Sequence, residues 1–208
     1  MSAAVTATRR RENTRAKLLE AASQVFAEVG LEGATVEAVC ERAGFTRGAF
    51  YSNFDSKDEL FLELAGSVAA ERLSAVRARV DELTAAGALA DGCDASTLVQ
   101  QVMDTGSDDR MSVMLLSEIR IRALRDEAFG RAYLLQEQEM VAGIARIIED
   151  VVADGTLTLR VPAEDAARTL MIYWEGMTVR GAMAGADAAR LRSIGGAGLG
   201  RMVELLLQ

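Results

Sequence analysis

Apolar residues recur at helical spacing along almost the whole chain. In the first long segment they follow the 3.6-residue repeat of one helix face. That stripe consists of Leu18, Leu19, Ala22, Val25, Phe26 and Val29. Alternating β-branched runs, which would indicate strands, are nearly absent, and the 208 residues include one Pro. The pattern predicts an all-α protein.

Glycines and capping residues divide this pattern into about nine helices. Gly30 is expected to stop the first helix, and Thr35 and Thr46 are candidate N-caps of the next two. Ser56, with Glu59 three residues later, has the sequence of a capping box. The expected helices span residues 11–29, 35–42, 46–52, 56–85, 97–105, 109–124, 127–153, 162–184 and 187–207. A loop is expected at 86–96 and a break at 105–108.

Composition excludes several kinds of chemistry. The chain has no His and only two cysteines, Cys40 and Cys93, without a CxxC pair. A zinc finger, a His-based metal site and a nucleophile with a His base are therefore excluded. We expect no catalytic residues, no metal, no cofactor and no enzymatic activity. Cys40 lies on the apolar face of a short helix and is interpreted as a small buried residue.

The sequence predicts neither a membrane span nor a signal peptide. No apolar stretch is long enough to span a bilayer. The amino-terminal residues are small and polar first and basic afterwards, which is the reverse of a signal peptide. We therefore expect a cytoplasmic protein with no membrane partner.

Charge is distributed unevenly. The net charge is −8, yet Arg9, Arg10, Arg11, Arg15 and Lys17 precede residue 18 with only Glu12 against them. A local basic patch on an acidic body is sufficient for nucleic acid, because contacts with phosphate are local.

The two short helices at 35–42 and 46–52 have the pattern of a helix-turn-helix, with Gly44 in the turn. The second of them carries small, hydrogen-bonding and aromatic residues where a surface helix would carry Glu and Lys. Such a helix is suited to fit against the groove of another molecule.

The string from Thr35 to Phe54, followed by Lys57-Asp58-Glu59-Leu60, resembles the TetR family of bacterial transcription regulators. The resemblance covers about residues 10–64. Cys40 stands where the family usually has Ala, and Asn53 where it often has His. The resemblance implies a DNA-binding domain over residues 1–55, with the basic arm, and a helical ligand-binding and dimerisation domain over residues 56–208.

The resemblance also implies roles for individual residues. The helix at 46–52 would enter the major groove, where Arg47 is the one long donor for guanine or an adjacent phosphate. Phe45, Phe50 and Phe54 are expected in the core. The expected DNA-binding residues are Thr35, Thr46, Arg47, Gly48, Ala49, Tyr51, Ser52, Asn53 and Lys57. Tyr51 could equally be core, and Arg9–Arg11 could be either a flexible groove-binding arm or a solvated one.

The remaining residues carry no motif with evident chemistry. This part is rich in Met and contains the only Trp, which suits an adaptable apolar cavity and ordinary core packing equally. The candidate pocket residues are Met103, Met114, Glu118, Tyr173, Trp174 and Met177. Glu118 could pair with a cationic ligand or with Arg120 or Arg122.

Gly195, Gly196, Gly198 and Gly200 lie within the last expected helix. They indicate either a close approach of two backbones or a helix break. We expect the last two helices to form a homodimer interface, so that the operator in double-stranded DNA would be palindromic.

The sequence therefore predicts a homodimeric repressor that a small-molecule effector releases from DNA. The alternative is a helical small-molecule-binding protein without sequence-specific DNA binding.

Overall fold

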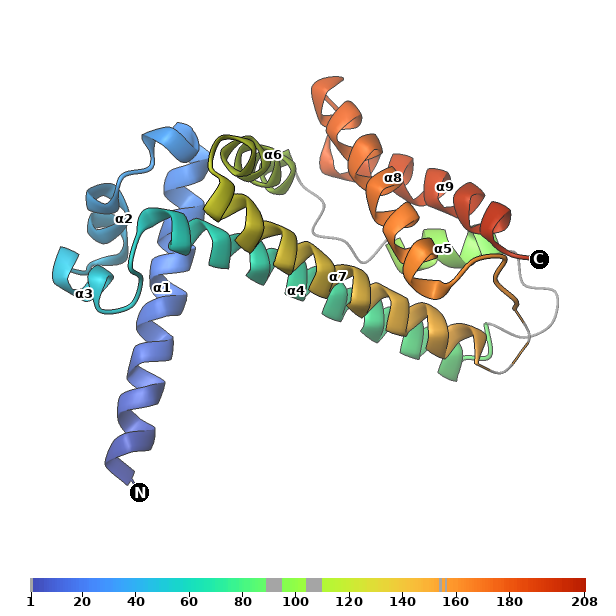
Figure 1. Ribbon diagram of the computed structural model, residues 1–208, viewed down its shortest axis with the longest axis horizontal. Helices are drawn as coiled ribbons and strands as arrows, with labels where there is room; N and C mark the ends of the chain where they lie inside the picture. Colours follow the sequence, from blue (N-terminus) through green and yellow to red (C-terminus); the bar gives the residue numbers. More distant parts are fainter. Residues whose placement is uncertain (1, 89–94, 104–109, 154, 156) are drawn as a thin grey trace. The chain divides into compact units, whose positions relative to one another are not determined.

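A computed structural model describes residues 2–88, 95–103, 110–153, 155 and 157–208 (Figure 1). Within those ranges the chain forms nine helices, and its only β pairing is an isolated antiparallel bridge between Leu159 and Leu207. The all-α prediction is confirmed.

Most helices begin and end within about two residues of the predicted positions. They are α1 (Ser2–Gly33), α2 (Val36–Ala43), α3 (Arg47–Tyr51), α4 (Lys57–Ala85), α5 (Ala95–Met103), α6 (Arg110–Arg125), α7 (Glu127–Val152), α8 (Ala163–Met183) and α9 (Ala188–Leu206). The predicted break at 105–108 and most of the predicted 86–96 loop, with Cys93, lie outside the described residues.

Helix α1 departs from the prediction at both ends. It begins at Ser2 rather than residue 11, because no Gly or Pro interrupts the helical hydrogen bonds before Gly30. Arg9–Arg11 therefore lie on a helix, and the flexible arm is not observed. Gly30 kinks the helix with a φ of 72°. Helical hydrogen bonding resumes directly after the kink, where Ala34 N–H donates to the Gly30 carbonyl at 3.0 Å.

The chain divides into two compact units, and α4, α6 and α7 contribute residues to both. The first unit comprises Met1–Val68 and Met114–Tyr133. In it, α2 and α3 form a pair beside α1 (Figure 1). Its core includes Phe26 and Phe61, whose rings meet edge to face at 6.3 Å between centroids. Val29, predicted to face inward, is 54% exposed next to the kink. The predicted domain boundary at residues 55 and 56 stays a prediction.

The second unit comprises Ala69–Val113 and Leu134–Gln208. Helix α7 packs along α4, where an ion pair joins Arg77 to Asp150 at 2.6 Å. Helix α9 packs on α5 and α8 (Figure 1). None of the described helices combines the length and apolar character that a membrane span requires.

The glycine cluster of α9 is helical and buried, so the predicted alternative of a helix break is wrong. A Cβ placed on Gly196 would lie 3.6 Å from Met103 Cβ in α5, and one on Gly198 would lie 2.7 Å from Tyr173 Cε1 in α8. The small residues therefore allow a close approach between helices of one chain. A dimer interface on the last two helices stays a prediction.

Candidate nucleic-acid interface

Two threonine caps and one glycine set the geometry of α2 and α3. Thr35 Oγ1 accepts from Ala38 N–H at 3.1 Å, and Thr46 Oγ1 accepts from Ala49 N–H at 3.2 Å, so both predicted caps are confirmed. Gly44 ends α2 in the left-handed conformation, with a φ of 72° that costs a glycine little. The turn between the helices therefore follows directly from local sequence.

One face of α3 is anchored in the core of the first unit. Phe50 and Phe54 are fully buried, as predicted, and Phe45 is half-buried. The Arg15 guanidinium stacks 4.3 Å from the centroid of the Phe54 ring. It also pairs with Glu63 of α4 and donates to the Asn53 carbonyl. Arg15, which the sequence suggested only as part of a basic patch, thus links α1, the turn that follows α3, and α4.

The opposite face of α3 is open. Thr46, Arg47, Gly48 and Ser52 are exposed and Tyr51 is 49% exposed, whereas Ala49 is half-buried. A Cβ on Gly48 would approach only Thr46 Oγ1, at 3.7 Å, so the surface there is nearly flat backbone. Five of the predicted DNA-binding residues therefore share one accessible surface.

Arg47 is held on this surface by two neighbours. Its Nη1 lies 2.5 Å from Glu37 Oε1 of α2, and its guanidinium carbon lies 5.9 Å from the centre of the Tyr51 ring. Contact with Tyr51, and then the charge of Glu37, raise the pKa of Arg47 above its ordinary value. Arg47 is therefore a fixed positive charge, and Glu37 is a neighbour that sequence reasoning missed.

Asn53 differs from the other predicted contact residues. It is only 8% exposed, and its amide nitrogen donates to the Ala49 carbonyl at 2.8 Å. Ser52 Oγ donates to the same carbonyl at 2.8 Å. Because the Asn53 amide closes the end of α3, it is not available on the surface in this conformation. The predicted phosphate contact of Asn53 is not supported by its position.

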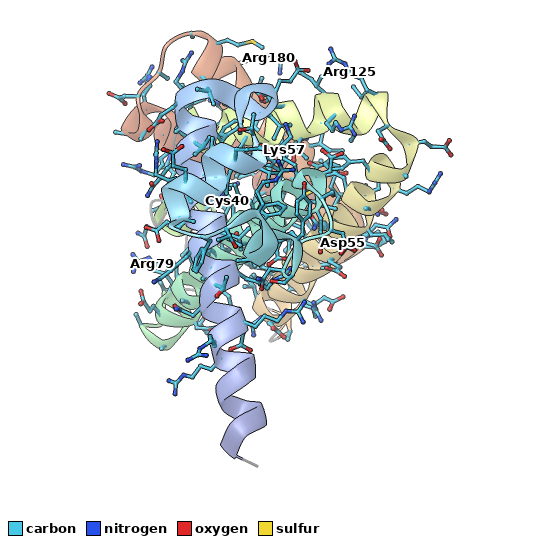
Figure 2. All side chains as sticks on the ribbon, turned by 90° about the vertical axis from the view of Figure 1, so that its left-hand side faces the viewer. Cys40, Asp55, Lys57, Arg79, Arg125 and Arg180 are labelled. Atoms are coloured by element: carbon cyan, nitrogen blue, oxygen red, sulfur yellow. The ribbon has the colours of Figure 1, made fainter. Side chains whose placement is uncertain are left out.

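Lys57, labelled in Figure 2, begins α4. Its Nζ donates to the Leu31 carbonyl at 3.0 Å. An ammonium group has three donors, so this bond leaves capacity for an anion. Thr35 is exposed at the start of α2, and Arg9, Arg10 and Arg11 are exposed on α1.

Helix α6 bonds directly to the helices that carry this surface. Glu118 Oε2 accepts from Leu31 N–H at 2.6 Å, just after the kink in α1. Arg122 pairs with Asp58 at 2.6 Å, which raises the pKa of Arg122. The predicted partners of Glu118 were a ligand, Arg120 or Arg122. The backbone contact was missed because only the fold brings residues 31 and 118 together.

The six candidate pocket residues fall into two groups. Met114 and Glu118 belong to the first unit, and the other four belong to the second. Of these, Met103, Tyr173 and Trp174 face the glycines of α9, and Trp174 is 9% exposed. Met177 is half-buried on α8. Their role in ligand binding stays a prediction.

These features define an all-α protein with an amino-terminal helix-turn-helix whose second helix presents an open, partly cationic face. Residues 18–64 match the family model described as bacterial regulatory proteins, tetR family. The amino-terminal helix-turn-helix region therefore matches the TetR family, as the sequence resemblance predicted.

Individual proteins are similar to this chain in part of their sequence or in their fold. The chain is 45% identical over 64 residues to the HTH-type transcriptional repressor AcnR of Corynebacterium efficiens, which is 31% of this chain and 34% of that repressor. The chain thus spans about a third of the length of such relatives. A TetR transcription regulator from Haloarcula marismortui shares the fold with a TM-score of 0.72, at 17% identity over 95% of this chain and 100% of its own. GusR of Salmonella enterica does so with a TM-score of 0.65, at 21% identity over 93% and 95%.

Proposed function

We propose that this chain is a homodimeric transcriptional repressor that binds double-stranded operator DNA and is released by a small-molecule effector. The observation that carries the proposal is the two-faced helix α3. Phe50 anchors it in the core, while Thr46, Arg47 and Gly48 lie exposed at its start. A recognition helix needs such an arrangement to bring a backbone and one long donor to the base edges.

The chemistry of each residue on and around α3 suggests its role. Arg47 reads guanine or an adjacent phosphate, and Gly48 with Ala49 allows close approach to the groove floor. Thr35, Tyr51, Ser52 and Lys57 bind backbone phosphates and fix the register. Asn53 positions the end of α3 from within, and direct phosphate binding is assigned to its neighbours.

A two-fold dimer would place two copies of α3 in successive major grooves of a palindromic site. Large exposed apolar side chains on the last two helices support this assembly: Ile172 is 62%, Met183 80% and Leu205 69% exposed in the single chain. Such side chains are favourable at an interface because burial removes apolar surface from water.

Effector control is proposed to act through α4 and α6. The contacts of Glu118 with Leu31 and of Arg122 with Asp58 tie α6 to α1 and to the start of α4. An effector that binds preferentially to one arrangement of these helices shifts the population and the spacing of the two α3 helices.

The test is selection of bound duplexes from random-sequence DNA, followed by binding measurements with the selected site and a scrambled duplex. Arg47→Ala should weaken binding to the selected site by about tenfold to a hundredfold. Arg168→Ala, which removes an exposed arginine of α8, is the matched control. Selection that enriches no sequence would refute the proposal and favour a small-molecule-binding protein without sequence-specific DNA binding.

A further inference from the structure

Glu37 places a carboxylate on the surface assigned to DNA. It lies in the first turn of α2, and its Oε1 is 2.5 Å from Nη1 of Arg47, the first residue of α3. Both side chains are well exposed, at 58% for Glu37 and 60% for Arg47. The pair therefore joins the two helices of the helix-turn-helix across the open face.

The acceptor in this pair has the chemistry of the expected DNA partner. A guanidinium binds a carboxylate, a phosphate or the O6 and N7 of guanine through the same N–H donors. The contact with Glu37 occupies one of the five N–H donors of Arg47, so Glu37 competes with DNA for that edge of the guanidinium. The carboxylate also repels any phosphate that approaches Arg47.

We propose that Glu37 is a positioning residue that sets DNA specificity by acting as an internal substitute for the DNA acceptor of Arg47. The inference rests on the proposed function of α3 in DNA binding. On non-specific DNA, Arg47 exchanges the Glu37 carboxylate for a single phosphate. This exchange adds little binding free energy, because one charged contact replaces another. On the operator, a base edge with two acceptors makes the exchange favourable. Glu37 thus weakens non-specific binding more than operator binding.

The experiment compares Glu37→Gln with Glu41→Gln in the full-length protein. Glu41 is exposed on the same helix one turn further on, so its substitution removes the same charge without removing the partner of Arg47. Affinity for the selected duplex and for a scrambled duplex is measured by fluorescence anisotropy at several salt concentrations. Circular dichroism verifies that each variant remains folded.

Glu37→Gln should raise affinity for the scrambled duplex by about fivefold, which corresponds to about 1 kcal/mol, the upper range for an exposed ion pair. Operator affinity should stay near the wild-type value. The variant loses the contact that orients Arg47, and this loss offsets the removal of the repulsion between the Glu37 carboxylate and DNA phosphates. The specificity ratio then falls by about fivefold. The salt dependence on scrambled DNA should steepen by about one counterion as Arg47 gains a phosphate.

A double-mutant cycle tests whether Glu37 acts through Arg47. In the Arg47→Ala background, Glu37→Gln should no longer change the specificity ratio. Equal effects of Glu37→Gln and Glu41→Gln, or an effect that persists without Arg47, would overturn the inference. A wild-type protein that binds selected and scrambled duplexes equally would instead refute the proposed function, so the two failures are distinguishable.

Discussion

Alanine substitutions at two neighbouring glycines of α9 should change stability in opposite directions. Gly196 and Gly198 are both buried in the same helix, so alanine brings the same intrinsic helical gain of about 1 kcal/mol at each. Their surroundings differ. A Cβ on Gly196 would meet Gln100 Cα at 3.5 Å and Met103 Cβ at 3.6 Å, which are ordinary van der Waals contacts. Gly196→Ala should therefore stabilise the protein by about 1 kcal/mol.

At Gly198 the added carbon would lie 2.7 Å from Tyr173 Cε1 and 2.8 Å from its Oη. The rigid ring must move away, and overpacking of this kind costs about 1–3 kcal/mol. After the helical gain is subtracted, Gly198→Ala should destabilise the protein by up to about 2 kcal/mol. Shortening the neighbour, in Gly198→Ala with Tyr173→Leu, should remove most of this penalty.

The assay is thermal unfolding followed by circular dichroism at one fixed protein concentration, since association would shift the midpoint. For a chain of this size, 1 kcal/mol moves the midpoint by about 2–4 °C. Gly196→Ala should raise the midpoint and Gly198→Ala should lower it. Destabilisation by both substitutions would refute the reasoning, because it would mean that the packing of α5 against α9 leaves too little space for a methyl group at Gly196.

Three further predictions concern the first unit. Glu118→Ala leaves Leu31 N–H without its charged acceptor and should lower the free energy of unfolding in urea by about 2 kcal/mol, whereas an unchanged midpoint would contradict the contact. Phe129 N–H, and after it Arg122, hold the pKa of Asp126 below its ordinary value, so the contribution of this carboxylate to stability is present above that ordinary value and is lost as pH falls below it. The urea midpoints measured at pH 7 and at pH 3.5 should therefore differ less in Asp126→Asn than in the wild type. Equal differences in the two proteins would contradict this contribution of Asp126. Burial raises the pKa of the Cys40 thiol, so iodoacetamide at pH 8 should alkylate Cys40 only after unfolding, as mapped by mass spectrometry, and rapid labelling of the folded protein would exclude its burial.

Signals that act within a few residues could be recognised directly from the sequence. Thr35 and Thr46 cap α2 and α3 as predicted, because an N-cap hydroxyl bonds to a backbone N–H only three residues away. Ser56 Oγ likewise accepts from Glu59 N–H at 3.0 Å. The burial of Phe50 and Phe54 followed from the resemblance to the family, which implies that both lie in the core. Together with the ordered family pattern, these signals were sufficient to predict the helix-turn-helix and its exposed face.

Contacts between distant residues required the tertiary structure. Nothing near Glu118 in the sequence indicates Leu31, and nothing near Arg15 indicates Phe54. The ion pair of Glu37 with Arg47 depends on the angle at which the turn brings α2 and α3 together.

By itself the sequence determined where the helices lie and which of them carries the exposed face proposed for DNA binding, because capping and periodicity are local properties. Only the tertiary structure decided which polar groups remain available on that surface. Asn53 is withdrawn into the end of α3, Arg47 is paired with Glu37, and Lys57 is bonded to the carbonyl after the kink in α1. The physical reason is that a hydrogen-bonding group takes the best partner within reach, and the packing of helices far apart in the chain sets which partners those are.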